Sequence, residues 1–269
     1  MITNKQIREL ITIRDKARAR RESGLYIVEG IRMFKEVPGD ICRQVIASRH
    51  FYEEHREELE EILSRIQKEQ KAGPGGIEVV EDNVFEKLSD TKTPQGIMCV
   101  CKQKLTSVSD IISDRQNALY MILEDIQDPG NMGTIFRTGE GAGVSGIILT
   151  EGCVDIYNPK TIRSTMGSVY RVPFAVAKDL GAAVDMLKSR GVKVYAAHLE
   201  GSSYYDEVNY GSAAFMIGNE GNGLKADTAA MADTYIKIPM EGEVESLNAA
   251  VASSILMYEH MRQRRGLFT

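Results

Sequence analysis

Three segments of this 269-residue chain are apolar along nearly their whole length: ALYMIL at 118–123, VKVYAA at 192–197 and AAFMIG at 213–218. A strand with one face exposed to solvent alternates apolar and polar side chains. A strand in a parallel sheet is buried on both faces, so its sequence is apolar almost throughout. Segments with helical periodicity lie between the three runs, as an α/β architecture requires. The sequence therefore predicts an α/β fold built on a parallel sheet.

The polar stretch KQKLTSVSDIISDRQN, residues 102–117, predicts a boundary between two domains. We expect a smaller α/β domain at 1–105, a linker at 106–117 and a domain with the parallel sheet at 118–269. The strands predicted from local patterns are 25–30, 44–48, 77–80, 96–101, 118–126, 146–150, 173–177, 192–199, 213–218 and 234–239. The predicted helices span about 3–19, 50–70, 83–89, 159–168 and 179–189. Four further helices are expected: one starts near Ile31, one runs through Arg137, a short one follows Gly223, and the last starts near Ser246. The segment KAGPGG at 71–76 predicts a flexible break.

Positive charge is concentrated at the N-terminus, although the net charge is −5. Any nucleic acid must therefore meet a local basic patch, and Arg14, Arg18 and Arg21 are its candidate residues. Charge alone leaves open the alternative that this segment is only a solvated helix face. The chain has no apolar run long enough for a membrane span and no signal-peptide pattern, which favours a cytoplasmic location.

Cysteine and histidine patterns give no sign of a metal site. The four cysteines form no CxxC pair and the histidines form no HExxH motif, so we expect no bound metal. The segment GEGAGV at 139–144 lacks the third glycine of a dinucleotide fingerprint, because Val144 stands there. This disfavours a nucleotide-dependent oxidoreductase.

Three loops that follow predicted strands carry polar side chains. In the first, QDPGNMG, a tight turn precedes a helix; Asn131 is a candidate cap for that helix, and Arg137 lies less than two turns further on. In the second, GNEGNG, glycines surround Glu220. In the third, Ser246 is a candidate N-cap or first-turn residue of the last helix, with Asn248 in the same turn.

These loops are expected to meet, because ligands of open α/β sheets bind at the carboxyl ends of the strands. Residues Leu247, Val251, Ile255 and Tyr258 form the stripe expected to face the core from the last helix. The residues alone therefore predict one composite ligand crevice and do not name the ligand.

The three segments resemble the three motifs of the SpoU (TrmH-like) RNA ribose methyltransferases of the SPOUT class. The matching parts are NMGTIFR at 131–137, IGNEG at 217–221, and the stretch from IPM at 238–240 to SLNAAVA at 246–252. The resemblance covers about residues 118–265. Residues 1–105 more loosely resemble the substrate-binding domain that often precedes it, a fold similar to certain ribosomal proteins that bind kinked RNA.

The resemblance implies a trefoil-knotted catalytic domain, S-adenosylmethionine as cofactor, and a homodimer with the catalytic crevice at the subunit interface. Backbone groups near Leu199, Gly201, Gly218, Ile238 and Leu247 would hold the cofactor. The expected activity is methylation of a ribose 2′-hydroxyl, first in large-subunit ribosomal RNA and second in transfer RNA. A non-catalytic RNA-binding or ribosome assembly factor is the remaining alternative.

The catalytic residues implied by the resemblance are Arg137, Asn131, Glu220, Ser246 and Asn248. Arg137 would act as a base or, because guanidinium stays protonated, as an electrostatic stabiliser of the reacting oxygen or a phosphate clamp. Asn131 and Glu220 would orient the site. Ser246 and Asn248 would bind the ribose–phosphate or the methionine end of the cofactor.

Overall fold

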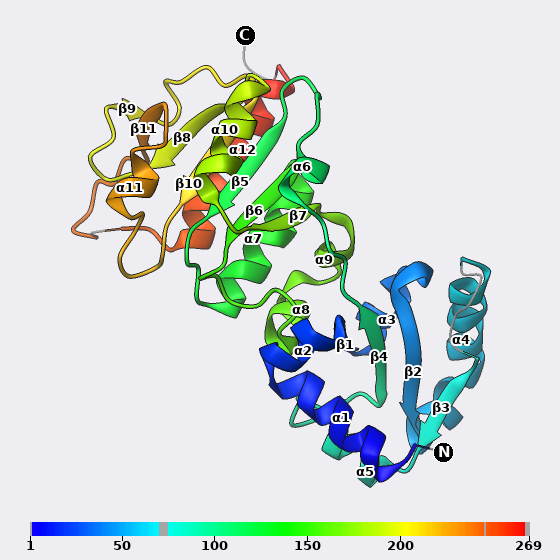
Figure 1. Cartoon of the computed structure of the whole chain (residues 1–269). Coiled ribbons are helices and arrows are strands. Elements are labelled where there is room, and N and C mark those ends of the chain that lie inside the picture. Colours follow the sequence, from blue (N-terminus) through cyan, green and yellow to red (C-terminus); the bar gives the residue numbers. More distant parts are fainter. Residues whose placement is uncertain (1, 70–74, 245, 267–269) are drawn as a thin grey trace. The chain divides into compact units, whose positions relative to one another are not determined.

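The computed structural model describes residues 2–69, 75–244 and 246–266 (Figure 1). The predicted break at 71–76 falls mostly outside these ranges. The chain forms two compact units. The N-terminal unit comprises residues 1–104 and 155–170, and the C-terminal unit comprises residues 105–154 and 171–269. Each unit has its own sheet.

The N-terminal unit contains a four-stranded sheet in the order β1-β4-β2-β3 (Figure 1). Strand β4 pairs antiparallel with β1 and β2, and β2 pairs parallel with β3. The strands are β1 Leu25–Glu29, β2 Cys42–Ser48, β3 Ile77–Val80 and β4 Ile97–Lys102. The helices are α1 Asn4–Asp15, α2 Ala17–Ser23, α3 Ile31–Glu36, η1 Gly39–Ile41, α4 Arg49–Lys68, α5 Asp82–Leu88 and α8 Pro159–Thr165.

The basic N-terminal segment forms two helices, so the prediction of a single helix at 3–19 is wrong. Lys16 has an extended backbone and separates α1 from α2. The break is stabilised by Arg20, whose buried guanidinium donates hydrogen bonds to the carbonyls of Ile13 at 2.9 Å and Arg14 at 2.6 Å. It also pairs with Asp155 at 2.7 Å. A buried arginine, invisible to helical periodicity, therefore sets the path of the first two helices.

Residues 155–170 pack with the N-terminal unit, although they lie within the predicted second domain. The ring of Tyr157 packs against that of Tyr26 at an interplanar angle of 39°, with the centroids 4.5 Å apart. Its hydroxyl oxygen accepts a hydrogen bond from the backbone N–H of Lys104 at 3.0 Å. The chain thus leaves the C-terminal unit after β6, contributes α8 to the N-terminal unit, and returns before β7. The predicted boundary at 106–117 stays a prediction.

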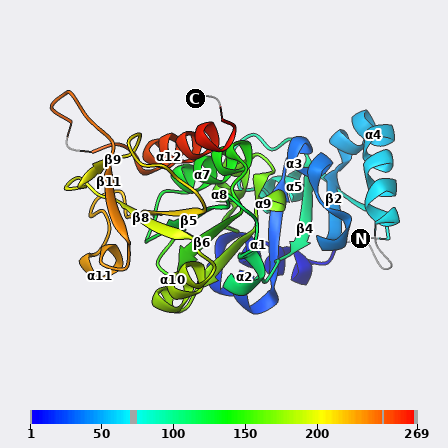
Figure 2. The same ribbon diagram turned by 90° about the horizontal axis from the view of Figure 1, so that it is seen from above.

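The C-terminal unit is built on a seven-stranded parallel sheet in the order β7-β6-β5-β10-β8-β11-β9, so the predicted parallel sheet is confirmed. Helices α7 and α12 lie on one face and α10 on the other (Figure 2), which explains why β5 and β10 are buried throughout. The strands are β5 Leu119–Leu123, β6 Gly146–Thr150, β7 Phe174–Ala177, β8 Lys193–Ala197, β9 Ser203–Tyr204, β10 Ala213–Ile217 and β11 Thr234–Lys237. The helices are α6 Val108–Ile111, α7 Pro129–Ala142, α9 Ser168–Arg171 (on the boundary between the units), α10 Leu180–Ser189, α11 Ala226–Ala229 and α12 Ala249–Arg264.

Strand β10 lies between β5 and β8, with Ile217 paired with Leu123 at their carboxyl ends. The chain runs outward from β5 through β6 to β7, then crosses to the other side of β5. This reversal is a topological switch point, where open α/β sheets bind their ligands. The loops that follow β5 and β10 therefore leave the sheet side by side.

The stripe predicted to face the core from the last helix is wrong. Val251 and Tyr258 are 48% and 46% exposed. The buried face instead carries Ala249, Ala250, Ser253, Leu256 and Met257. These mostly small residues let α12 pack closely on α7, where the sulfur of Met257 would lie 3.6 Å from a Cβ added to Gly139. Leu256 and Met257 supply the large apolar side chains of the buried face, whereas Val251 and Tyr258 are left at the surface. No helix within the described ranges is long and apolar enough to cross a membrane.

Candidate active site

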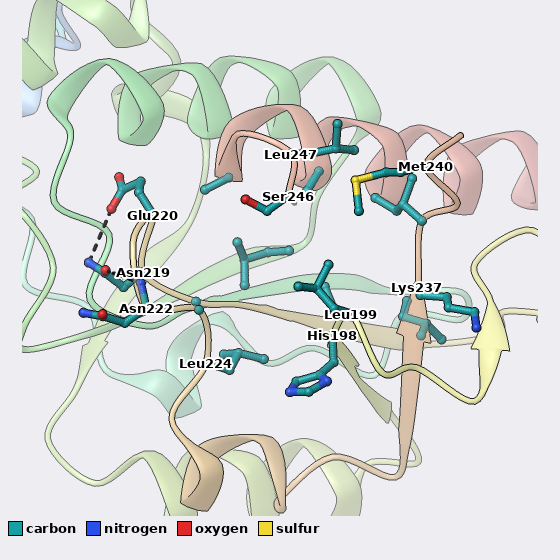
Figure 3. Close-up of a pocket in the computed structure, with 18 of the residues that line it drawn as sticks. His198, Leu199, Asn219, Glu220, Asn222, Leu224, Lys237, Met240, Ser246 and Leu247 are labelled. Atoms are coloured by element: carbon teal, nitrogen blue, oxygen red, sulfur yellow. Dashed lines mark hydrogen bonds between the residues drawn. The ribbon is translucent and has the colours of Figure 1, made fainter. Parts of the chain in front are cut away.

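A cavity of about 570 Å³ opens at the carboxyl ends of β8, β10 and β11 (Figure 3). This volume is typical of a small-molecule site. Of the predicted cofactor residues, Leu199, Gly218, Ile238 and Leu247 line the cavity. Gly201 is not among its lining residues; it lies against β11, where an added Cβ would be 2.6 Å from the carbonyl carbon of Ile236.

The glycine loop after β10, residues 218–224, doubles back on itself beside this cavity. A Cβ added to Gly218 would lie 2.1 Å from the backbone of both Gly223 and Leu224, so no larger residue fits at position 218. Two backbone hydrogen bonds join Asn219 and Gly223. The side chain of Asn219 donates to the Asp125 carbonyl at 2.8 Å, which ties the loop to the end of β5. The sequence predicted a role for the glycines of this loop and none for Asn219, although Asn219 lies within the matching segment IGNEG.

Glu220 is fastened to the start of α7. Its carboxylate accepts hydrogen bonds of 3.0 Å from the backbone N–H groups of Gln127 and Asp128 and from the side chain of Asn131. Burial acts to raise the pKa of Glu220, but these hydrogen bonds outweigh it and lower the pKa from its ordinary value. Glu220 is therefore an ionised anchor whose oxygens are already occupied, and it is poorly suited to take a proton.

Asn131 and Asn248 extend this contact to the third loop. The side-chain oxygen of Asn131 accepts a hydrogen bond of 2.9 Å from the side-chain nitrogen of Asn248. The oxygen of Asn248 accepts from the backbone N–H groups of Ala250 and Val251. One line of hydrogen bonds, Glu220–Asn131–Asn248, thus joins all three predicted loops.

Two predicted helix caps are wrong. Asp128, rather than Asn131, caps α7, and its side chain accepts from the Asn131 N–H at 2.8 Å. Asn248, rather than Ser246, caps α12. In both places two residues with capping side chains stand within three positions, and sequence preference cannot choose between them. Because Asn131 does not cap α7, its side chain can bond to Glu220 and Asn248 and so link the three loops. The exposed Ser246 lines the cavity.

Arg137 lies on α7, one residue past Phe136, with its side chain exposed. No hydrogen bond or ion pair joins it to any residue that the structure describes. It is not a lining residue of the cavity. The fold therefore brings together four of the five predicted catalytic residues, and leaves the fifth on the same helix as Asn131 with a free guanidinium.

The line of amides presents donors to a ligand. Each Asn side-chain nitrogen carries two N–H groups, and in Asn131 and Asn248 one of the two is used within the line. The remaining N–H groups suit an anionic or electron-rich oxygen, such as a phosphate, a carboxylate or an ionising hydroxyl. The described residues contain no group of three or more His, Cys, Asp or Glu that could hold a metal ion.

The three predicted RNA contacts differ in availability. Arg14 is 16% exposed and donates to the carbonyls of Lys87, Leu88 and Ser89 at the end of α5, so its guanidinium is engaged. Arg18 is 84% exposed and pairs with the exposed Glu22. Arg21 is exposed.

These features define an α/β protein whose candidate ligand cavity lies at the carboxyl ends of β8, β10 and β11, beside the switch point between β5 and β10. Residues 118–258 match the model of the SpoU rRNA Methylase family. Residues 4–99 match the MRM3-like substrate binding domain, which confirms the predicted N-terminal substrate-binding domain.

Named relatives agree with these matches. The chain is 37% identical over 188 residues to the Bacillus subtilis 23S rRNA (guanosine(2553)-2′-O)-methyltransferase RlmP, covering 68% of this chain and 71% of the relative. It is 26% identical to rRNA methyltransferase 3, mitochondrial, of Xenopus laevis, covering 97% and 74% of the two chains. The solved AdoMet-bound rRNA methyltransferase from Sinorhizobium meliloti has a TM-score of 0.84 and 26% identity, covering 100% and 97%. The chain belongs to the SpoU methyltransferase family.

Proposed function

We propose that this protein transfers the methyl group of S-adenosylmethionine to a ribose 2′-hydroxyl in large-subunit ribosomal RNA. The observation that carries the proposal is the hydrogen-bonded line Glu220–Asn131–Asn248, which joins the three family motifs beside one cavity. Membership of the family supports the reaction. The name of RlmP, which specifies 23S rRNA and a 2′-oxygen, supports the substrate.

The cavity fits this cofactor. Its middle is walled by Leu199, Leu224 and Leu247, which suit a flat purine, and one end carries the polar groups around Glu220 (Figure 3). The absence of a side chain at Gly218 lets loop 218–224 fold back on itself beside the cavity. When bound, S-adenosylmethionine supplies a methyl group that its positively charged sulfur already activates.

The residues of the chain position and stabilise the reacting oxygen. The free N–H groups of Asn131 and Asn248 orient an oxygen of the ribose or of a neighbouring phosphate. Ser246 adds a hydroxyl at the cavity wall. Arg137 stabilises negative charge that develops on the 2′-oxygen, or clamps the adjacent phosphate, because its guanidinium stays protonated.

We propose a homodimer in which the exposed apolar side chains of α12 meet a second copy and Arg137 completes a crevice at the interface. Val251 and Tyr258 form an apolar face with Ile255 between them, and such faces mark association sites. Tyr258→Glu should halve the mass measured by light scattering and abolish methyl transfer. A fully active monomeric variant would contradict the dimer.

The N-terminal unit would bind RNA and place it for reaction, with Arg18 and Arg21 contacting phosphates. We keep these two and leave out Arg14, because its guanidinium is engaged. We further propose that the protein acts in the cytoplasm and that its C-terminal segment is threaded as a trefoil knot. The match to the SpoU family over residues 118–258 supports the knot.

Transfer RNA is the second candidate substrate, and a non-catalytic assembly factor is the third. Retention of Arg137, Asn131 and Asn248 disfavours the third. One experiment separates all three. Ribose 2′-O-methyl groups are mapped in ribosomal and transfer RNA from a deletion strain and its parent. Loss of one ribosomal site, restored by purified protein with S-adenosylmethionine, is the expected result. Loss of a transfer RNA site would redirect the proposal, and no lost site would favour the assembly factor.

A further inference from the structure

Glu124 is a buried carboxylate to which the proposed reaction assigns no role. It directly follows β5, and its side chain is only 4% exposed. An ionised carboxylate at such a depth is costly unless its oxygens are hydrogen-bonded. Its burial therefore directs attention to the groups that hold it.

Both oxygens of Glu124 hold the segment that follows the glycine loop. One accepts from the backbone N–H of Lys225 at 2.8 Å, and the other accepts from the hydroxyl of Thr228 at 2.5 Å. The backbone N–H of Glu124 donates to the Ile217 carbonyl at 2.9 Å, at the end of β10. Glu124 thus contacts the chain both before and after loop 218–224.

The loop is fixed at two points by two carboxylates. Near its start, Glu220 is bound to the N-terminus of α7. At its end, Glu124 holds Lys225, the residue after Leu224. Leu224 lines the cavity on the same side as His198 (Figure 3). Any shift of Lys225 would therefore move one wall of the cavity.

We propose that Glu124 is a positioning residue for the cofactor: it fixes the end of loop 218–224 and so the cavity wall formed by Leu224, without touching the ligand. Glu124 is not among the residues that line the cavity. The inference rests on the proposed function, because it takes the cavity to be the cofactor site.

A role for the charge of Glu124 and a role for its hydrogen bonds predict different outcomes for Glu124→Gln. A glutamine can accept from the Lys225 N–H and donate to Thr228, because a hydroxyl is both donor and acceptor. If hydrogen bonds position the loop, glutamine should preserve the site. If charge is required as a partner of the Lys225 ammonium, which lies 3.8 Å from the carboxylate, glutamine should fail as alanine does.

The experiment measures S-adenosylhomocysteine binding by calorimetry, and KM and kcat for methyl transfer, in wild type, Glu124→Ala and Glu124→Gln. Alanine should raise the Kd and the cofactor KM by about tenfold, as expected for buried hydrogen bonds lost. The kcat and the RNA KM should stay within about threefold, and glutamine should restore binding. Glu259→Ala is the matched control, since Glu259 is also a buried acid but lies on α12 with Arg262 and Gln263.

Wild-type Kd in folded Glu124→Ala, or a failure of Glu124→Gln equal to that of alanine, would overturn the inference. If Glu124→Ala does not fold, Thr228→Val takes its place, with a raised Kd supporting the inference and an unchanged Kd overturning it. If wild type itself does not bind S-adenosylhomocysteine, the proposed function fails instead. Amide exchange of residues 218–225 then still tests whether Glu124 fixes the loop, because it should be faster in Glu124→Ala than in Glu259→Ala.

Discussion

Two arginines of the N-terminal helices and one arginine of helix α7 are used in opposite ways. Arg14 and Arg20 donate to backbone carbonyls within the N-terminal unit, and Arg20 also pairs with Asp155. Arg137 on α7 has no partner among the described residues. A basic run in a sequence therefore measures the charge present in a segment, whereas the charge available to a ligand depends on which carbonyls and carboxylates the fold brings near.

The largest effect on stability is expected at Arg20. Arg20→Met removes the buried guanidinium, which leaves Asp155 and the carbonyls of Ile13 and Arg14 without this partner. Breaking a buried pair from one side costs about 3–5 kcal/mol, so the melting temperature should fall by roughly 6–20 °C in calorimetry. Arg21→Met is the control, because an exposed substitution should stay within about 0.5 kcal/mol of wild type. Equal melting temperatures for the two variants would show that Arg20 is not a structural residue.

The next largest effect is expected at Arg137 and concerns the reaction. Arg137→Lys keeps the positive charge and loses the planar fork, so methyl transfer should fall by about 10²–10³-fold. Binding of S-adenosylhomocysteine should be unchanged, because Arg137 does not line the cavity. Single-turnover kinetics and calorimetry measure the two quantities separately. Turnover near that of wild type would remove any special role for Arg137.

The sequence predicted the fold well where burial alone decides it. The apolar runs at 118–123, 192–197 and 213–218 became neighbouring strands of one parallel sheet. It failed where two packings were equally consistent with the pattern. The stripe from Leu247 to Tyr258 has helical spacing, yet the buried face is the one that combines the small Ala249, Ala250 and Ser253 with Leu256 and Met257. Periodicity identifies the possible faces, whereas the neighbours that the fold supplies, here α7, decide which of them is buried.

The candidate site shows a similar limit. The motifs identified Asn131, Glu220 and Asn248, and the structure joins them directly. Sequence reasoning assigned the caps to Asn131 and Ser246 instead of Asp128 and Asn248. It gave no role to Glu124, whose partners lie about a hundred positions away at Lys225 and Thr228. Such contacts arise only when the sheet forms, so local patterns cannot reveal them.

A smaller effect should separate engaged arginines from available ones in RNA binding. Replacing Arg18 and Arg21 by Ala should reduce the slope of log affinity against log salt concentration by roughly 1.5–2. Each phosphate contact that is lost means that fewer counterions are released from the RNA on binding. Arg14→Ala should leave that slope unchanged and lower the melting temperature, because its guanidinium holds the end of α5. Filter binding over a range of salt concentrations gives the slope. The opposite assignment, with Arg14 alone altering the slope, would reverse our choice of contacts.

The smallest expected effect is on the pH dependence of stability. It extends the contrast between engaged and available groups to a side chain that titrates, His260. His260 on α12 is buried, and its Nε2 donates to the Gly211 carbonyl at 2.8 Å. Its Nδ1 is buried without a hydrogen-bond partner among the described residues. Burial, together with the positive charge of Arg264, lowers the pKa of His260 below its ordinary value of 6.5, and the Gly211 carbonyl only partly opposes this.

A histidine whose pKa is lowered by folding binds protons more readily in the unfolded chain. Its contribution to stability is therefore complete above about pH 6.5 and is lost as the pH falls toward the folded-state pKa. His260→Gln retains a donor for Gly211 and cannot titrate, so its free energy of unfolding should vary less between pH 7 and pH 5 than that of wild type. Chemical denaturation at several pH values measures the difference, with His50→Gln on the surface of α4 as control. Parallel pH profiles for wild type and His260→Gln would mean that the buried Nδ1 finds a hydrogen-bond acceptor when the ring becomes charged, and the histidine would then belong with the engaged groups.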